Sequence, residues 1–320
     1  MTKRAPFPPY EILQARGAQD AQEKTKRLER LYHLTQKHSW DGKAVLGELL
    51  ARHGRPGAHM PAETRDALSR ILTVLMWGEL AAWNISADLA LEIGDVDAKM
   101  AATAQTFDEA RHFYVLCDYV TALGPSATIG GLPRRLLNKV LDAPTLATKL
   151  IGMQLLFETN AVVMFRRIAE SGLCPILSEL LPYFERDESR HVGLGVMYLP
   201  RLIRGMSRRE AARTARFQTE CVLLLTAGGI TLAEDFETLD LDQRTMALRV
   251  TRMQDEIVQQ MAEHHGKGIL RAVRTPKAGV GPAILEWLHP PGGVWSTSPL
   301  NQRLHRGMRH GLGALDRALA

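Results

Sequence analysis

One short pattern occurs twice in this chain of 320 residues. The first copy is Glu79 followed by Asp-Glu-Ala-Arg-His at 108–112, and the second is Glu158 followed by Asp-Glu-Ser-Arg-His at 187–191. The interval from the lone Glu to the Glu of the block is the same, from 79 to 109 and from 158 to 188. A four-helix bundle holds two metal ions with one Glu from each of two helices and a Glu-x-x-His pair from each of the other two. The pattern therefore predicts six metal ligands: Glu79, Glu109, His112, Glu158, Glu188 and His191.

A third Glu-x-x-His, from Glu286 to His289, shows how specific the longer pattern is. It has no Asp before its Glu and no matching Glu upstream, and Pro290-Pro291 follows directly. A chain of this length contains such a short match roughly once or less by chance. We interpret Glu286 and His289 as an accidental match and the doubled block as a metal site.

Composition favours helices throughout the chain. Ala, Leu, Arg and Glu are plentiful, and runs of alternating Val, Ile and Thr that would suggest strands are scarce. We predict an all-α fold: a four-helix bundle with additional helices and an irregular C-terminal tail, in one folding unit. The predicted regions are an N-terminal helical extension (1–60), the bundle (61–200), additional packed helices (201–270) and a tail containing Pro and Gly (271–320).

Proline, glycine and capping residues mark where the helices begin and end. The expected helices cover about 18–36, 61–94, 96–123, 144–172, 175–200, 207–238 and 241–265. The first helix start carries Pro61, and Ser207-x-x-Glu210 forms a capping box. We also predict that Pro182 interrupts or kinks the 175–200 helix, because proline lacks a backbone donor. Such a break would either open a path toward the metals or be a harmless kink.

The predicted ligands fall on the four successive bundle helices. Residues three apart share one helix face, so each Glu-x-x-His pair can present its carboxylate and imidazole to the same metal. Apolar residues flank Glu79 and Glu158, and a Glu in such a stripe is costly unless a charge neutralises it. The neighbouring charged residues Asp108 and Asp187 are candidates to accept a hydrogen bond from the ligand histidines. Arg111 and Arg190 would hold these aspartates or belong to a solvated helix face.

Charge and cysteine content exclude several classes of protein. The formal net charge is +5, and no Lys- and Arg-rich block has interleaved aromatics, so we expect no nucleic-acid partner. Cys117, Cys174 and Cys221 form neither a disulfide framework nor a Cys-x-x-Cys motif. Residues 1–10 lack the apolar core of a signal peptide, and the apolar run 221–233 is too short to span a bilayer. We therefore expect a cytoplasmic protein without a membrane span.

The doubled motif resembles the fingerprint of the ferritin-like di-iron carboxylate proteins, and the similarity covers about 61–200. The closest members are oxygen-activating: monooxygenase hydroxylases, acyl-carrier-protein desaturases, and the ribonucleotide reductase small subunit with its oxidase relatives. The resemblance implies that the six ligands bind two Fe ions, or a mixed Mn/Fe pair, with Glu109 and Glu188 bridging. It also implies that Asp108 and Asp187 hydrogen-bond the ligand histidines, with the histidine of the opposite helix as one possible partner.

Departures from the family patterns narrow the choice among the subfamilies. The position of the reductase radical tyrosine is Leu116 here. The positions that form a Tyr–Val cross-link in the ligand-binding oxidases correspond to Met153 and Ala82, so no such cross-link is expected. Arylamine N-oxygenases have an extra His ligand where this chain has Phe184.

The remaining interpretation is a di-iron oxygenase or oxidase that activates O2. It would hydroxylate, desaturate or N-oxygenate a small organic or carrier-bound substrate, as a homodimer, with electrons from an external reductase or ferredoxin. Residues one turn from the ligands would shape the substrate pocket or simply pack in the core. These residues are Trp83, Gln105, Phe113, Gln154, Val162, Phe184 and Val192.

Two alternatives remain from the sequence. One is a ferroxidase or peroxidase that handles iron or oxidants. The other is a non-catalytic, metal-stabilised assembly subunit, whose basic tail would be an interaction surface, an anionic-carrier site or a solvated face. The basic residues of the tail are Lys267, Arg271, Arg274, Lys277, Arg303, Arg306 and Arg309.

Overall fold

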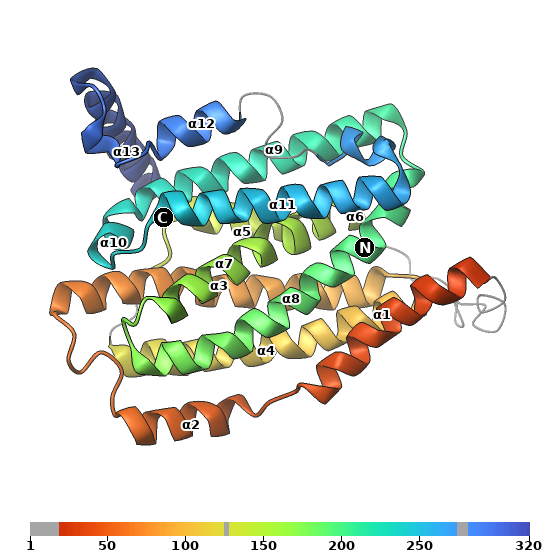
Figure 1. The fold of residues 1–320 in the computed structure, drawn as a ribbon, viewed down its shortest axis with the longest axis horizontal. Helices are drawn as coiled ribbons and strands as arrows, with labels where there is room; N and C mark the ends of the chain where they lie inside the picture. The colour runs from red at the N-terminus through yellow and green to blue at the C-terminus, as the bar shows by residue number, and fades with distance from the viewer. Residues whose placement is uncertain (1–18, 125–127, 274–280) are drawn as a thin grey trace.

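The structure is a computed structural model that describes residues 19–124, 128–273 and 281–320. The start of the predicted first helix at residue 18, together with Arg274 and Lys277, lies outside the described residues. The described residues form helices and no strand (Figure 1), which confirms the predicted all-α class. The α-helices are α1 (Gln19–Lys37), α2 (Gly42–His53), α3 (Ala62–Glu92), α4 (Val96–Leu123), α5 (Gly131–Leu141), α6 (Leu146–Leu150), α7 (Glu158–Glu170), α8 (Pro175–Arg204), α9 (Arg208–Thr231), α10 (Ala233–Thr238), α11 (Gln243–His265), α12 (Gly281–Leu288) and α13 (Pro299–Leu319). A π-helix, η1 (Ile151–Phe157), joins α6 to α7, and two 3₁₀ segments, η2 (Lys267–Arg271) and η3 (Val294–Ser296), lie in the C-terminal part.

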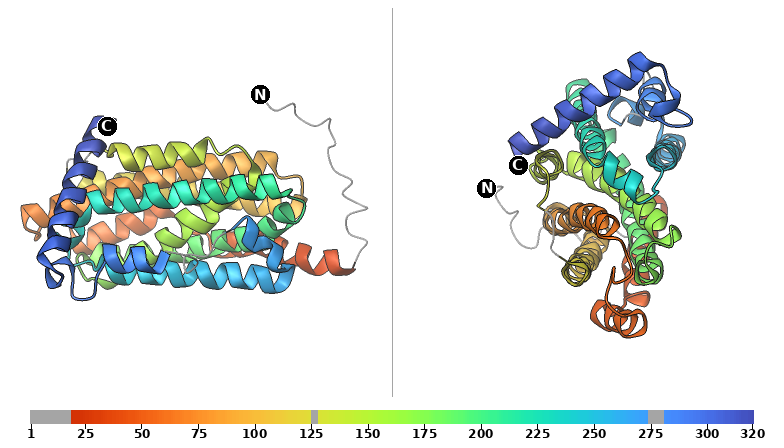
Figure 2. Two further views of the ribbon diagram at one scale, coloured as in Figure 1. Left: turned by 90° about the horizontal axis from the view of Figure 1, so that it is seen from above. Right: turned by 90° about the vertical axis from the view of Figure 1, so that its left-hand side faces the viewer.

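Four helices build the centre of the molecule. The helix α3 packs along α4, and α7 packs along α8 (Figure 1). On one side α1 lies against α4 and α8, and α2 lies against the same two helices. On the other side α11 packs on α7 and α8, while α9 packs on α5; Figure 2 shows these outer helices around the bundle. The bundle is therefore covered by additional helices on two sides.

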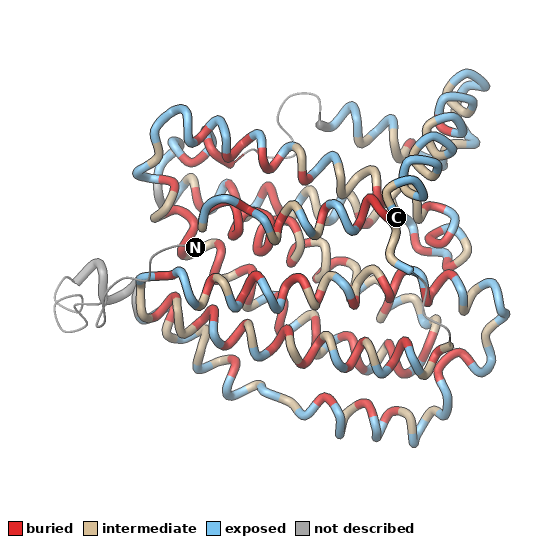
Figure 3. Tube along the Cα trace, turned by 180° about the vertical axis from the view of Figure 1, so that it is seen from behind, coloured by how far each residue is buried: buried red, intermediate tan, exposed pale blue. Residues whose placement is uncertain are grey.

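Polar and charged residues divide the buried interior into two apolar clusters. One cluster contains Leu89, Ala101 and Leu194, and the other contains Leu72, Leu116 and Phe184. The helices α3, α4 and α8 each contribute to both clusters, and their predicted metal ligands lie between the two contributions. In the fourth position η1 contributes to one cluster and α7 to the other, with Glu158 where they join. Figure 3 shows buried residues along the length of the bundle. Burial of the two apolar clusters fixes the helices that carry the polar layer.

Local signals in the sequence explain several helix boundaries. The side chain of Asp95 accepts a hydrogen bond from the backbone of Ala98 at the start of α4. Ser207 and Glu210 form the predicted capping box of α9. Close packing of α8 requires Gly195, because an added Cβ would lie 2.5 Å from the Cβ of Gln154.

Several sequence predictions of helix shape are wrong. The predicted helix 144–172 is divided into α6, η1 and α7, and the predicted helix 207–238 is divided at Leu232 into α9 and α10. The helix α8 continues through Pro182 as one α-helix, so the alternative in which a new helix begins there is excluded. The irregular segment of the bundle is instead η1, directly before Glu158. Proline at position 182 loses one backbone bond, and packing on both sides of α8 outweighs that loss.

The predicted irregular tail also requires correction, since it ends in α13, a 21-residue helix. Ser298 caps its N-terminus by accepting from the backbone of Asn301, and Pro299 occupies the first turn. The glycines in this segment suggested an irregular tail. The Leu, Arg and Ala residues between them favour helix, and the inner face of α13 packs on α5 and α9. Figure 1 shows α13 projecting at one end of the bundle. Among the described helices, none combines the length and the apolar character that crossing a membrane requires.

Candidate metal centre

The six predicted ligands come together in the polar layer of the bundle. Each of these residues is nearly inaccessible to solvent, with relative exposures of 0–5%. Glu79 comes from α3, Glu109 and His112 from α4, Glu188 and His191 from α8, and Glu158 begins α7.

The ligand atoms form two overlapping groups, each within 4.8 Å. The first group contains Glu79, Glu109, His112 and Glu188. The second group contains Glu109, Glu158, Glu188 and His191. We call them the His112 group and the His191 group. The two groups share Glu109 and Glu188, and each also has one Glu and one His of its own.

The shared carboxylates present one oxygen to each group. For Glu188, Oε1 lies 3.0 Å from Nδ1 of His112 and Oε2 lies 2.7 Å from Nδ1 of His191. For Glu109, Oε2 lies 3.6 Å from Nδ1 of His112 and Oε1 lies 3.1 Å from Nδ1 of His191. Each carboxylate can therefore bridge two cations.

Several of these atoms have no hydrogen-bond partner although they are buried. They are Oε2 of Glu109, Oε1 of Glu188 and Nδ1 of His112. An unsatisfied buried polar atom costs about 1–3 kcal/mol, and more if it is charged. A cation in contact with all three atoms would remove that cost, so the residues fit a bound metal.

The electrostatics of the cluster lead to the same conclusion. Burial and the charge of Glu188 raise the pKa of Glu79 well above its ordinary value, and burial with Glu188 and Glu109 does the same to the pKa of Glu158. Burial opposes the charged form of His112, but nearby carboxylates, first Glu188, raise its pKa well above the ordinary value. Two divalent cations would balance the four carboxylates.

The histidines are oriented by aspartates of the opposite helix. Nε2 of His112, on α4, lies 3.3 Å from Oδ2 of Asp187, on α8. Nε2 of His191, on α8, lies 3.3 Å from Oδ2 of Asp108, on α4. A hydrogen bond at Nε2 leaves Nδ1 of each ring as the free ligand atom that faces the carboxylates.

Two arginines join the aspartates into one buried network. Arg111 donates to Asp108 and, at 2.8 Å, to Oδ2 of Asp187. Arg190 donates at 2.6 Å to Oδ1 of Asp187 and at 3.2 Å to Oδ2 of Asp108. The Arg111 side chain is 3% exposed and that of Arg190 is 9% exposed. The alternative of a solvated helix face for these arginines is therefore wrong.

Sequence reasoning missed Trp40, in the loop between α1 and α2. Its Nε1 donates to Oδ2 of Asp187 at 2.7 Å, across 147 positions of the chain. Its ring lies 5.7 Å from that of Phe184, which stacks on His112 at 4.3 Å between ring centroids. Aromatic rings therefore enclose the His112 group. A single Trp in a loop has no periodic signal that could have predicted this contact.

The His191 group has polar neighbours instead. Nε2 of Gln105 donates to Oε1 of Glu109 at 2.9 Å and to Oε1 of Glu158 at 2.7 Å. Oε1 of Gln105 accepts from Nε2 of Gln154 at 3.0 Å. Both glutamines are 1% exposed.

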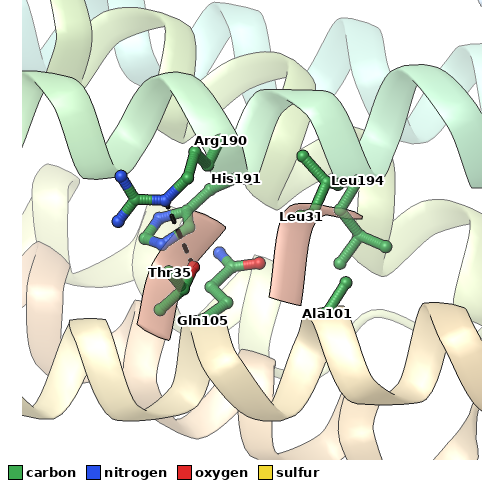
Figure 4. Close-up of a pocket in the computed structure, with 7 residues that line it drawn as sticks. All are labelled: Leu31, Thr35, Ala101, Gln105, Arg190, His191 and Leu194. Atoms are coloured by element: carbon green, nitrogen blue, oxygen red, sulfur yellow. Dashed lines mark hydrogen bonds between the residues drawn. The ribbon is translucent and has the colours of Figure 1, made fainter. Parts of the chain in front are cut away.

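A small opening lies beside His191, between α1, α4 and α8 (Figure 4). Its cavity volume is about 10 Å³, and its lining residues are Leu31, Thr35, Ala101, Gln105, Arg190, His191 and Leu194. Oγ1 of Thr35, on α1, accepts from Nε of Arg190 at 3.2 Å. In Figure 4, Gln105 reaches from α4 toward α8 beside this pair. Of the residues that the sequence predicted to shape a pocket, Gln105 lines this opening.

The other predicted pocket residues have different roles. Trp83 is 38% exposed and packs on Phe113 at 6.3 Å between ring centroids, so it belongs to the surface. Val162 and Val192 are buried.

The side chain of Glu286 is 58% exposed and pairs with Arg244, which agrees with an accidental motif.

The π-helix places Glu158 and is itself stabilised from α11. A π-turn leaves some backbone carbonyls without their usual intrahelical partners. Nε2 of Gln254 donates to the carbonyl oxygen of Leu155 at 3.0 Å and to Oγ1 of Thr159 at 2.9 Å. The irregular backbone is thus held in place directly beside a predicted ligand.

Comparison with known structures confirms the fold. The arrangement of helices is a ferritin-like fold, shared with R2-like ligand-binding oxidases. A variant of an R2-like ligand-binding oxidase with an aerobically reconstituted Mn/Fe cofactor aligns with a TM-score of 0.53 at 18% identity, over 76% of this chain and 94% of its own. A second variant of the oxidase aligns with a TM-score of 0.53 at 19% identity, over 76% and 93%. The sequence matches no protein-family model, and no curated protein resembles it at a significant level.

Proposed function

We propose that this chain is a dinuclear metal oxidoreductase that activates O2 to oxidise a small organic or carrier-bound substrate. The observation that carries the proposal is the pair of overlapping ligand groups, in which Glu109 and Glu188 each offer one oxygen to either side. Four carboxylates and two imidazoles suit iron and manganese. The similar R2-like oxidases carry a Mn/Fe cofactor, which supports a mixed Mn/Fe pair beside two Fe ions.

In this proposal each ligand has a defined task. Glu79 and His112 would hold one ion and Glu158 and His191 the other, while Glu109 and Glu188 each offer an oxygen to both. A metal pair bound here supplies one-electron and O2 chemistry that the side chains of this chain do not provide. The crossed aspartates keep both histidines in one orientation, and the surrounding apolar clusters exclude bulk water from the centre.

The remaining parts of the proposal concern partners. Electrons would come from an external reductase or ferredoxin, since the sequence has no flavin or iron–sulfur motif. A homodimer is supported by exposed aromatic side chains on the neighbouring helices α3 and α4, namely Trp77, Phe107 and Tyr114. We also propose a cytoplasmic location.

The test is metal loading followed by exposure to O2. The purified chain is loaded anaerobically with Fe²⁺, or with Mn²⁺ and Fe²⁺, and then mixed with O2 while optical and Mössbauer spectra are recorded. We expect about two metals per chain and a spectral change that depends on O2. The double variant Glu109→Ala, Glu188→Ala should lose most of the metal, and the control Glu286→Ala should keep it. Full metal occupancy in the double variant would exclude the assignment.

The small size of the opening favours one alternative function. Its cavity volume of about 10 Å³, room for about one water molecule, is far below the roughly 300–1,000 Å³ typical of pockets for small organic ligands. A ferroxidase or peroxidase needs room only for O2, peroxide or iron. Turnover with these alone, and no acceleration by any organic substrate, would favour this alternative.

A non-catalytic assembly subunit has less support from the basic tail. Arg309 is engaged in an ion pair with Glu237 at 2.8 Å, and Arg306 lies over the Trp295 ring. These contacts hold both arginines against the chain's own residues.

A further inference from the structure

The C-terminal helix α13 carries an uncharged stripe along its outer side. Its members are exposed, and their spacing of three or four residues places them on one face of the helix. They are Leu300, Leu304, Gly307, Gly311, Ala314, Leu315 and Ala318. The relative exposure is 66% for Leu300, 50% for Leu304 and 46% for Leu315, and a Cβ added at Gly307 or Gly311 would meet nothing within 4 Å. A contiguous apolar face of this kind marks an interaction site.

Contacts on the other side of α13 fix the direction in which this stripe points. Asp316 accepts a hydrogen bond at 2.6 Å from the backbone nitrogen of Leu132, and Nε2 of His305 lies 2.8 Å from the carbonyl oxygen of Trp287. The N-cap residue of α5, Gly130, provides no side-chain cap, so Asp316 supplies that acceptor across 184 positions. The one acidic residue of α13 is therefore engaged on the inner side of the helix.

The exposed charged residues of α13 are basic. Arg303, His310 and Arg317 follow one another at intervals of seven residues, which keeps them on one flank of the stripe. Arg303 and Arg317 form no ion pair with any residue that the structure describes. Beside them the ring of Trp295, 68% exposed, lies 6.0 Å from the guanidinium carbon of Arg306. The apolar stripe thus has a basic flank with an aromatic ring.

Charge and shape favour a flat anionic surface as the partner of this face. Two copies of the chain packed antiparallel through the stripe would bring Arg303 of each toward Arg317 of the other, and like charges at such positions oppose pairing. Figures 1 and 2 show α13 projecting at one end of the bundle. A projecting helix with an apolar stripe, exposed arginines and a neighbouring Trp has the features of helices that lie on membrane surfaces.

We propose that α13 binds the surface of a membrane that contains anionic lipids. The stripe enters the headgroup region, and Arg303 and Arg317 contact the anionic headgroups. The helix lies in the plane of the surface and does not cross the bilayer. Binding of such a helix gains from both the buried apolar area and the attraction to anionic lipid, so the loss of either should weaken it. The proposal goes beyond the proposed oxidoreductase activity and does not depend on it.

The test is cosedimentation of the full-length chain with lipid vesicles. Vesicles of phosphatidylcholine alone are compared with vesicles of phosphatidylcholine and phosphatidylglycerol in equal parts. One double variant, Leu300→Gln with Leu304→Gln, removes apolar contact, and another, Arg303→Gln with Arg317→Gln, removes charge. Circular dichroism checks the fold of each variant.

Matched double variants on other elements are the controls. Leu91→Gln with Leu270→Gln changes leucines of α3 and η2 that are 59% and 41% exposed. Arg208→Gln with Arg209→Gln removes two exposed arginines of α9. These controls alter the apolar surface and the net charge by the same amounts as the α13 variants, and they leave α13 intact.

We expect the native chain to bind the mixed vesicles at least about 10-fold more tightly than phosphatidylcholine alone. The arginine variant of α13 should weaken binding to the mixed vesicles about 25-fold, or about 5-fold for each arginine. The leucine variant should weaken it about 10-fold or more. Both controls should bind as the native chain does.

The proposal is overturned if the native chain does not bind the mixed vesicles, or if either α13 variant binds them as tightly as the native chain. It is also overturned if the controls lose as much affinity as the α13 variants, because the binding would then depend only on overall charge or apolar surface. Sedimentation velocity gives the oligomeric state of the same proteins. A native dimer that ignores vesicles and dissociates in the leucine variant would assign the stripe to a second copy of the chain instead.

Discussion

The His112 group and the His191 group have equivalent ligands and different surroundings. Beside His112, the ring of Phe184 stacks at 4.3 Å and Trp40 lies behind it. Beside His191, the amide of Gln105 donates to the carboxylates and accepts from Gln154, and a small opening begins. Aromatic rings thus pack against His112, and amides with a small opening lie beside His191.

The repeated sequence pattern contains this difference at two positions. Four residues before the block Glu, the first copy has Gln105 and the second has Phe184. Four residues before the lone Glu, the first copy has Leu75 and the second has Gln154. The symmetric positions of the repeat carry the ligands, and these two asymmetric positions set the environment of each ligand group. Two metals with similar ligands would therefore meet different solvation and different access.

The largest effect is expected from removing the Glu that belongs to one group alone. Glu79→Ala should leave about one metal per chain in the His191 group, and Glu158→Ala about one in the His112 group. Elemental analysis after loading gives the number, and Mössbauer spectra distinguish the two surroundings. Glu286→Ala should keep the native content. Two metals in either variant, or identical spectra from both, would contradict the prediction that the chain has two distinct metal positions.

The next effect concerns stability without metal. Phe184→Ala should lower the free energy of unfolding by about 3–5 kcal/mol, because it leaves a cavity beside His112. Gln105→Ala should cost less, about 1–3 kcal/mol, since it removes hydrogen bonds and little apolar surface. Urea denaturation of the metal-free variants measures both. Equal losses would show that the two sides do not differ as their contacts indicate.

Lower pH should weaken metal binding on both sides. The pKa of Glu79 and of His112 is raised in one group, and the pKa of Glu158 and of His191 is raised in the other. Groups with raised pKa keep their protons, which metal must displace, so the affinity falls as pH falls, about tenfold per pH unit for each proton released. Chelator competition at three pH values measures the slope. If the metal affinity depended on pH at one position only, the two ligand groups would differ in a way that their residues do not predict.

The smallest difference is expected between the two aspartates. Asp108→Asn and Asp187→Asn should each weaken metal binding by about 10- to 100-fold, because the amide loses the charge that orients the ligand histidine. Asp187→Asn should be the more damaging, since Asp187 also accepts from Nε1 of Trp40. Metal titration compares the two aspartate variants. Trp40→Phe should weaken metal binding only by the amount by which Asp187→Asn exceeds Asp108→Asn. Equal effects of the two aspartate variants would show that the hydrogen bond from Trp40 does not contribute to metal binding.

Much of the fold could be predicted because its signals are local. Caps at Asp95 and Ser207 lie within three residues of the groups they satisfy, and helical periodicity needs only neighbouring residues. Failures occurred where long-range packing overrides local preference. The new helix that one alternative placed at Pro182 does not form, since α8 is continuous there, and the π-turn before Glu158 depends on Gln254, 99 positions from the carbonyl that it contacts.

By itself, the sequence determined the composition of the centre. Spacing along a helix places Glu109 with His112 and Glu188 with His191, because three residues make almost one turn. Only the tertiary structure decided which neighbours each ligand has. The crossed aspartate–histidine pairs, the contact of Trp40 and the hydrogen bond between the two amides join residues that are 49–147 positions apart. Such contacts depend on how whole helices pack, and packing is set by the shape of the entire interior rather than by any local pattern.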